Sequence, residues 1–463
     1  MSTTLPTTVT ADEAVDRLRT VDTVALGLAT GQPPAFVEAL GRRGDWEGLR
    51  IYGAILMVPT AAFTHPNVHL LSAFWGPIER GLRERGHNVG FVPTDFRGMS
   101  PLLERLHPRV VATVASMPDA DGWCSLSLHA GAGVAEYRRA AGDPERLLIV
   151  EVSRHYPRTL GLGPEHPHAI HVDDIDVLIE SDAHPPVYPD PTPTEVDRAI
   201  AELARSYVHD GATLQTGIGS VPSTIARLIA EGAGGGYGVH SEMFTTGLMQ
   251  LHRAGKITNQ KGQFDGVSVT TFAGGTPDLY AWLDGNEDVR FLPVEMVNSP
   301  ERIARNHDMI TINAALALDI HGQMVADTIG GDQFSGVGGH EDFVSGPALS
   351  LVNRSLVCLP STVTVKGVRR SRILPYLPPG TVVTTPRHQV DVVITEHGAA
   401  ELRGKTVRQR GEALAAIADP EFRDELHGAA MRASRGRSPY QPDVHEQLRD
   451  VSLAGSGRTY FQP

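Results

Sequence analysis

The stretch LQTGIGSVPSTIARLI, residues 214–229, runs from an apolar segment through a glycine turn into a helical pattern. Gly217 and Gly219 stand between the two parts, and Pro222 follows near the first turn of the expected helix. The stretch LGLATGQPPAFVEAL, residues 26–40, has the same order of strand, glycine turn, proline and helix. One unit therefore occurs twice, about 190 residues apart in the chain.

Apolar and amphipathic segments also alternate between these two stretches. RVVATVAS (109–116) and RLLIVEVS (146–153) flank the helical pattern GVAEYRRAA (133–141). Strands that alternate with helices are typical of α/β domains with mainly parallel sheets. We therefore predict the α/β class.

Two further pairs of segments repeat in the same order along the chain. PDADGWCSL (118–126) and LDIHGQMVA (318–326) each place a polar turn with glycine before an apolar run. DIDVLIESD (174–182) is similar to QVDVVITEH (389–397). Because the three correspondences keep one order, we predict two similar domains that are related by duplication.

A proline-rich segment, PPVYPDPTP (185–193), separates the two halves. Proline fixes φ and lacks an amide hydrogen, so an extended linker is expected. We predict an N-terminal domain over 1–184, the linker over 185–193 and a C-terminal domain over 194–463. Thr194 is expected to cap a helix that begins at Glu195.

Charge and cysteine content exclude several classes of protein. The net charge of -13 over 463 residues argues against non-specific nucleic-acid binding, although a local site can still bind an anion. Two cysteines, Cys124 and Cys358, are too few for a disulfide framework or a cysteine-based zinc site. No segment resembles a signal peptide or approaches the roughly 20 apolar residues of a membrane span. We expect a cytoplasmic protein without nucleic-acid or membrane partners.

Two glycine-rich loops are candidates for binding an anionic ligand. The first comprises Gly217, Ile218, Gly219, Ser220 and Val221, and it precedes a helix N-terminus, which favours anions. It lacks the third glycine of a dinucleotide fingerprint. A plain strand–helix turn is therefore an equally open interpretation.

The second loop, GGDQFSGVGGHEDF (330–343), contains Gly336, Gly338 and Gly339 directly before His340. Such a loop can direct backbone N–H groups at a developing oxyanion. The aromatic and aliphatic residues within it are unlike those of a solvated linker. We therefore favour a functional loop over a surface turn.

Three other motifs are interpreted as structural. EHGAAELRGKT (396–406) has five residues between its glycines instead of the four of a phosphate loop, and a helical turn is expected there. EHPHAIHVDD (165–174) holds three histidines in a loop without metal-binding spacing, and we predict no metal site. Cys124 lies in an apolar setting and is expected to be an inert thiol.

Glu242 is the one charged side chain in GGGYGVHSEMFTTGLMQLH (234–252). It is either an exposed residue in a first helical turn, favoured by the helix dipole, or a carboxylate in a dry pocket. A glutamate can be a nucleophile, and a thioester suits it because the thiolate departs without a proton. We expect Glu242 to stand apart from other charges, because a cation would pair with it and a second carboxylate would raise its pKa.

Taken together, these segments resemble the acetyl-CoA hydrolase/transferase family, which includes acetate-, succinate- and 4-hydroxybutyrate-type CoA-transferases. The resemblance is strongest over about 212–426. It is carried by GVHSEMFTTG, LQTGIGSVPS, FSGVGGHEDF, MITINAALALDIHGQ, SRILPYLPPGTVVTTPR and VVITEHGAAELRGKTVRQRGEAL. It implies two CoA-transferase domains with the active site in the cleft between them.

The resemblance also implies residue roles. Glu242 would carry first the acyl group and then CoA. The loops 217–221 and 336–340 would contact CoA, and YPRTLG (156–161) would line the cleft. Thr246 and His340 depart from residues that are common in the family, which leaves the acyl specificity open.

We therefore predict a CoA-transferase that moves CoA from an acyl-CoA to a small carboxylic acid, with no metal and no permanently bound cofactor. Transfer is expected to dominate because apolar neighbours of Glu242 would keep water from the intermediate. The alternatives are an acyl-CoA hydrolase that uses the same glutamate and a catalytically silent CoA-binding paralogue. A homodimer is expected. The acyl group and the acceptor acid are open.

Overall fold

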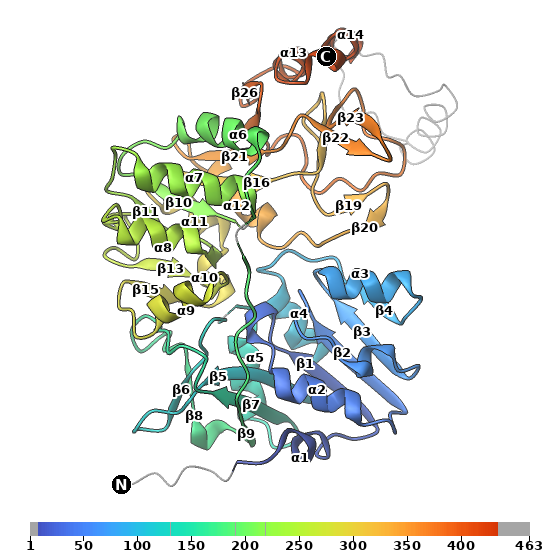
Figure 1. The fold of residues 1–463 in the computed structure, drawn as a ribbon, viewed down its shortest axis with the longest axis vertical. Coiled ribbons are helices and arrows are strands. Elements are labelled where there is room, and N and C mark those ends of the chain that lie inside the picture. Colours follow the sequence, from blue (N-terminus) through green and yellow to red (C-terminus); the bar gives the residue numbers. More distant parts are fainter. Residues whose placement is uncertain (1–7, 130, 190, 218, 434–463) are drawn as a thin grey trace, which may run out of the picture.

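Two β-sheets form the centres of the two halves of the chain (Figure 1). The structure is a computed structural model that describes residues 8–433 apart from 130, 190 and 218. Figure 1 shows the first half in blue and teal and the second half in green to orange, with one long connection running between them. No helix within the described residues has the length and apolar character needed to cross a membrane.

The first sheet has seven strands in the order β4-β3-β2-β1-β5-β7-β9, and all of its pairs are parallel. Its strands are β1 (Val21–Leu26), β2 (Gly48–Gly53), β3 (Val68–Ser72), β4 (Val89–Phe91), β5 (Val110–Ser116), β7 (Leu147–Ser153) and β9 (Val177–Ser181). The helices of this half are α1 (Ala11–Val15), α2 (Pro34–Arg42), α3 (Pro77–Glu84), α4 (Met99–Leu106) and α5 (Val134–Ala141). β5 is buried along its whole length, as expected of a parallel strand covered on both faces.

The second sheet has six strands in the order β11-β10-β16-β21-β25-β26, of which only β26 pairs in the antiparallel direction. Its strands are β10 (Thr213–Thr216), β11 (Gly238–Val239), β16 (Met309–Ala314), β21 (Arg354–Cys358), β25 (Val392–Thr395) and β26 (Gly398–Glu401). Across the sheet, the order β11-β10-β16-β21-β25 repeats the order β2-β1-β5-β7-β9 of the first sheet, with the second strand of each set at the outside of the first. This shared order supports the predicted duplication.

The remaining elements surround these sheets. The helices of the second half are α6 (Glu195–Arg205), α7 (Ser220–Glu231), α8 (Thr246–Arg253), α9 (Pro277–Leu283), α10 (Val294–Val297), α11 (Pro300–Arg305), α12 (His340–Ala348), α13 (Val407–Ala416) and α14 (Arg423–Ala433). The short strands are β6 (Trp123–Ser125), β8 (Ala169–His171), β12 (Met243–Phe244), β13 (Ser268–Thr270), β14 (Phe272–Ala273), β15 (Val289–Phe291), β17 (Ala317–Asp319), β18 (Met324–Val325), β19 (Thr328–Ile329), β20 (Asp332–Gln333), β22 (Thr362–Val365), β23 (Val368–Ser371) and β24 (Ile373–Leu374).

The polar turns that repeat in the sequence have the same local structure. Asp119 Oδ1 accepts the backbone N–H groups two and four residues ahead at 3.1 and 2.9 Å. Asp319 Oδ1 does the same at 3.0 and 2.9 Å. Gly122 and Gly322 occupy the same place in each turn with φ of 85° and 87°, a conformation that favours glycine. The agreement between the hydrogen bonds and the glycine φ values of the two turns is a second argument for the duplication.

The boundary between the halves agrees in part with the sequence. Thr194 caps α6, with its side chain accepting the N–H of Asp197, so the predicted helix start at Glu195 is confirmed. The described residues between 182 and 193 lie in no helix or strand. The domain limits themselves stay predictions. The helical turn expected at Gly398 is wrong, because that segment forms the edge strand β26 instead.

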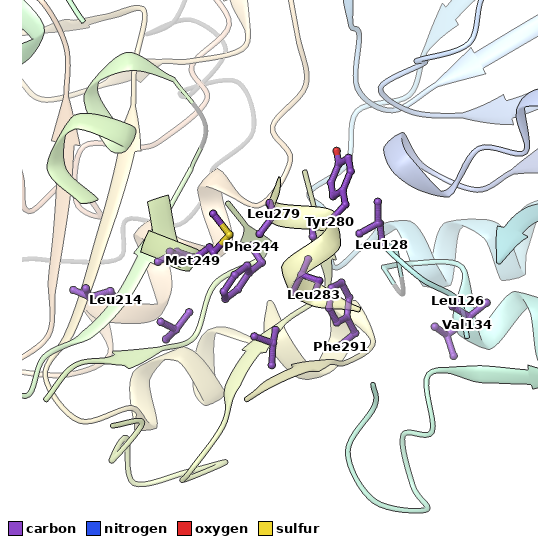
Figure 2. Packing of buried hydrophobic residues seen from close by; sticks show 14 of the residues in the cluster. Leu126, Leu128, Val134, Leu214, Phe244, Met249, Leu279, Tyr280, Leu283 and Phe291 are labelled. Atoms are coloured by element: carbon purple, nitrogen blue, oxygen red, sulfur yellow. The ribbon is translucent and has the colours of Figure 1, made fainter. Parts of the chain in front are cut away.

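A hydrophobic cluster joins the two halves (Figure 2). Leu128 and Val134 of the first half belong to the same buried cluster as Phe244, Leu279 and Phe291 of the second. Burial of apolar surface is the main favourable term in folding, so this cluster holds the halves in a defined relation. The relation matters because Glu242 lies beside it, two residues before Phe244.

Candidate active site

Glu242 lies between β11 and β12, where the chain leaves the edge of the second sheet. Its backbone carbonyl accepts the N–H of Thr271 at 3.0 Å and the hydroxyl of Thr270 at 2.9 Å, which fixes the main chain. The next helix begins only at Thr246. The interpretation of Glu242 as an exposed residue in a first helical turn is therefore wrong.

The carboxyl group of Glu242 faces a pocket between the two halves. The first half supplies most of the wall: Leu28, Ala29, Ala54, Ile55, Phe74, Thr94, Phe96, Met99 and His129. The second half supplies Phe272 and Gly338 besides Glu242. The pocket has a cavity volume of about 30 Å³, which is more than one water molecule needs.

Asn298, which follows α10, orients the carboxyl group. Its Nδ2 donates to Glu242 Oε2 at 2.6 Å and to Asp342 Oδ2 at 2.9 Å, so one amide group connects two carboxyl groups. Arg97 of the first half pairs with the buried Asp342 at 2.8 Å and with Asp95 at 3.0 Å. A continuous chain of polar contacts therefore crosses the cleft to the glutamate.

Burial changes the protonation of both carboxyl groups. It raises the pKa of Glu242 to about 7, and the hydrogen bond from Asn298 opposes this rise. Burial likewise raises the pKa of Asp342 to about 8, against the hydrogen bond from Asn298 and the charge of Arg97. The expectation that Glu242 stands apart from other charges is correct along the sequence but wrong in space, because the fold brings Asp342 to the same amide.

The second glycine loop lies directly against the glutamate. A β-carbon at Gly339 would overlap Glu242 Oε2 and would stand 2.7 Å from Asn298 Nδ2. Gly338 has a φ of 55° and lines the pocket. A β-carbon at Gly336 would stand 2.6 Å from a backbone carbonyl oxygen of the first half. The loop therefore needs glycine in order to pass between the halves.

His340 differs from Gly338 of the same loop, because it does not line the pocket. It is the first residue of α12, and its Nε2 lies 3.0 Å from Thr385 Oγ1. The side chain is not part of the pocket wall. Its predicted contact with CoA therefore stays a prediction.

The first glycine loop joins β10 to α7, near Glu242 but outside the pocket wall. The carbonyl of Thr216 accepts the hydroxyl of Ser241, the residue before the glutamate, at 3.2 Å. Gly217 faces open space within the described structure, where no atom outside its two chain neighbours lies within 4 Å of a β-carbon added there. Gly219 has a φ of 124° and directly precedes α7, whose first turn contains Ser220 and Val221. Ile218 lies outside the described residues. Contact of this loop with CoA stays a prediction.

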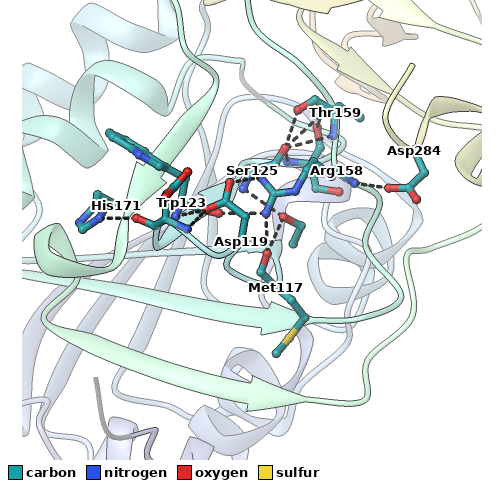
Figure 3. Close-up of polar contacts among 11 residues, drawn as sticks. Met117, Asp119, Trp123, Ser125, Arg158, Thr159, His171 and Asp284 are labelled. Atoms are coloured by element: carbon teal, nitrogen blue, oxygen red, sulfur yellow. Dashed lines mark hydrogen bonds and ion pairs between the residues drawn. The ribbon is translucent and has the colours of Figure 1, made fainter. Parts of the chain in front are cut away.

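The YPRTLG segment binds to the loops around it (Figure 3). The guanidinium of Arg158 donates to the carbonyls of Met117 and Trp123, both at 2.9 Å, and pairs with Asp119 at 3.2 Å. Its backbone N–H donates to Asp284 of the second half at 2.7 Å. The segment therefore helps to join the halves, and none of its residues lines the Glu242 pocket.

The histidine segment and Cys124 have structural roles. His168 is buried and lies 2.8 Å from the carbonyl of Ser127 and 5.0 Å, ring to ring, from Phe291. The described part of the chain contains no group of three or more side chains arranged to hold a metal ion. Burial raises the pKa of the Cys124 thiol to about 12, in line with an inert thiol.

Several residues of the site gave no signal in the sequence. Asn298 lies in the ordinary-looking stretch MVNSP, and its role depends on contacts across 56 and 44 residues of chain. Arg97 and His129 belong to the other half. Asp342 stands in the second glycine loop directly after His340 and Glu341, and nothing in this polar stretch distinguishes it from its neighbours.

Comparisons with known proteins point to one family. The sequence model of the acetyl-CoA hydrolase/transferase C-terminal domain matches residues 275–430. The 4-hydroxybutyrate coenzyme A transferase of Clostridium kluyveri is 36% identical over 427 residues, which are 90% of this chain and 96% of that protein. The butyryl-CoA:acetate CoA-transferase of Anaerostipes caccae is 34% identical, over 92% of this chain and 96% of its own. The crystal structure of RipA from Yersinia pestis has a TM-score of 0.83 at 31% identity, covering 92% and 97%.

Proposed function

The chain belongs to the acetyl-CoA hydrolase/transferase family and is an enzyme with CoA-transferase activity, and from this premise we propose that Glu242 is its nucleophile. In this proposal CoA moves from an acyl-CoA to a small carboxylic acid through a glutamyl-CoA thioester. The observation that carries the proposal is the placement of the Glu242 carboxyl group in a small pocket between the halves, held by Asn298. The substrates are an acyl-CoA and a carboxylate.

The first half-reaction makes the enzyme thioester. A carboxylate oxygen of Glu242 attacks the thioester carbon, the C–S bond breaks, and CoA leaves as a thiolate. The product is a mixed anhydride of the acyl group and Glu242. The thiolate then attacks the side-chain carbonyl of Glu242, and the acyl group departs as a carboxylate. No proton donor is needed at either step, because both leaving groups are stable anions.

The second half-reaction runs the same steps with the acceptor acid. Its carboxylate attacks the glutamyl thioester, and the CoA thiolate leaves. The thiolate then attacks the acyl carbonyl of the new anhydride, which releases acyl-CoA and restores the Glu242 carboxylate. Backbone N–H groups of Gly338 and Gly339 are our candidates for stabilising the oxyanions, because this loop lies against the carboxyl group.

The decisive experiment is to trap the intermediate. Native enzyme incubated with an acyl-CoA and no acceptor should carry CoA on the peptide that contains Glu242, as read by mass spectrometry. The Glu242→Gln variant should carry none. Glu341→Gln is the matched control, since Glu341 is a partly buried glutamate whose side chain bonds to Thr385 instead of facing the pocket. An adduct on another residue would overturn the proposal, and no adduct at all would favour the silent paralogue.

The hydrolase is the second candidate, because water could resolve the same intermediates. Transfer is supported by the complete or near-complete burial of Val239, Met243 and Phe244 around the glutamate. Thiol release from an acyl-CoA should therefore be slow alone and should accelerate with added carboxylate. Rapid release that ignores added acids would favour the hydrolase.

The remaining expectations stay predictions with simple tests. Activity should survive dialysis against a chelator, because the proposed steps need no metal. Light scattering should give the mass of a homodimer.

A further inference from the structure

His129 stands out in the pocket wall because its side chain is polar and unsatisfied. It is 1% exposed, and neither ring nitrogen has a hydrogen-bond partner within the described structure. Its nearest aromatic neighbour is Phe272, with ring centroids 5.6 Å apart. A buried polar group without a partner costs roughly 1–3 kcal/mol, so such a group in a binding pocket indicates that a ligand supplies the missing partner.

The rest of the wall defines what that ligand can be. Of the described residues that line the pocket, only His129 and Glu242 have titratable side chains, Thr94 adds one hydroxyl, and the others are apolar or glycine. Among the described residues, no lysine or arginine lines the pocket. A second carboxylate on the substrate would therefore be buried beside Glu242 without a cation to pair with.

Burial also keeps the imidazole of His129 neutral. It lowers the pKa of His129 to about 3, with a smaller contribution from the neighbouring His168. A neutral imidazole offers one N–H donor and one acceptor nitrogen. That pair suits a hydroxyl group, which can donate and accept, or a carbonyl oxygen, which can accept.

The geometry points to His129 as a specificity-determining residue that selects short acyl groups carrying an uncharged oxygen, a hydroxyl or keto group, over plain and dicarboxylic acyl groups. This inference rests on the proposed function, since the pocket holds the acyl group only if Glu242 is the nucleophile. Thr94 is the second polar side chain that such an oxygen can reach in the pocket.

The first test uses the native enzyme with acetate as acceptor. The donors are butyryl-CoA, 3-hydroxybutyryl-CoA, 4-hydroxybutyryl-CoA and succinyl-CoA, which differ little in length. We expect kcat/KM for at least one hydroxyacyl donor to exceed that for butyryl-CoA by about tenfold, as one added hydrogen bond allows, and that for succinyl-CoA by more. If butyryl-CoA or succinyl-CoA is the best donor, the inference is overturned. If no donor supports transfer, the proposed function fails instead.

The second test changes the residue. His129→Leu should reduce the preference for the hydroxyacyl donor by about tenfold, whereas His129→Gln, which keeps a neutral donor and acceptor, should retain part of it. His307→Leu is the control, because it makes the same change at an exposed histidine outside the pocket wall, and its preference should stay within about twofold of the native value. If His129→Leu keeps the native preference for the hydroxyacyl donor, the histidine contributes only to packing. If His129→Leu fails to fold, as its melting temperature would reveal, the native ratio and His129→Gln decide.

Discussion

Gly339 lies so close to Glu242 that a β-carbon at position 339 would overlap the carboxylate oxygen Oε2. The same β-carbon would stand 2.7 Å from the amide nitrogen of Asn298, so neither neighbour can accommodate it in place. Replacement of this glycine should therefore act on the reacting group itself.

Gly339→Ala should lower kcat by roughly 100-fold, because the Glu242 carboxylate, our proposed nucleophile, would be displaced from its position of attack. Gly44→Ala is the control, since a β-carbon there meets no atom within 4 Å. Steady-state kinetics of the two variants check the prediction, with melting temperatures to confirm folding. Full activity of Gly339→Ala would mean that the loop does not confine the carboxylate.

Asn298 should act as a positioning residue. Asn298→Ala should lower kcat by roughly 100-fold. It should also move the acidic midpoint of the pH profile upward, because in the native enzyme the hydrogen bond from Asn298 lowers the pKa of Glu242 and the variant lacks that bond. Asn286→Ala, outside the pocket wall, should leave both unchanged. A loss of activity without any movement of the midpoint would indicate a purely structural role for Asn298.

The activity of the native enzyme should depend on pH through Glu242. Only the ionised carboxylate attacks, and burial raises its pKa to about 7. The logarithm of kcat/KM should therefore rise with pH up to about 7 and level off above it. The measurement needs an acceptor acid that stays ionised over the whole range. A profile that is already flat at pH 5 would contradict the burial of the ionised group.

The same carboxyl group should destabilise the fold at high pH. Its pKa rises from 4.5 in the unfolded chain to about 7 in the folded one, so folding is favoured below the unfolded value and weakened as pH rises through the folded value. The shift corresponds to about 3 kcal/mol. Glu242→Gln should therefore raise the urea midpoint clearly at pH 8 and little at pH 4.5. The exposed control Glu231→Gln should show no such difference between the two pH values.

Gly217 offers a test of CoA binding that leaves the fold intact. A β-carbon there meets only open space, so Gly217→Ala should keep its melting temperature. If CoA occupies that space, KM for acyl-CoA should rise several-fold, with Gly44→Ala as control. Gly219 and Gly338 are less suitable, because their φ values of 124° and 55° would strain any side chain. An unchanged KM for acyl-CoA would show that CoA does not contact this loop.

The sequence predicted those parts of the fold that depend on neighbouring residues. The apolar runs of β5 and β7 and the cap at Thr194 are local patterns, and the structure confirms them. The turn at Gly398 was mistaken for a helix because pairing with β25, a tertiary contact, decides its structure. The prediction of the site is limited in the same way, because tertiary contacts also decide which residues meet there.

Glu242 and Gly339 belong to motifs that can be read along the chain. The partners that determine the chemistry of Glu242 cannot, because Asn298 and Asp342 reach it only after the second half has folded. Arg97 and His129 come from the other half altogether. A charge pattern in one segment therefore singled out Glu242 as a candidate but did not reveal its electrostatic environment.

The origin of the pocket wall has a consequence for how such enzymes diverge. If Glu242 is the nucleophile, as we propose, the attacking carboxylate belongs to the second half, and most of the pocket wall around it comes from the first. Selection can therefore alter the preferred acid through substitutions in the first copy while the second keeps its reactivity. Under the proposed function, the two halves divide reaction from recognition, so a substitution in the wall of the pocket can change the preferred acid without touching the carboxyl group or its amide partner.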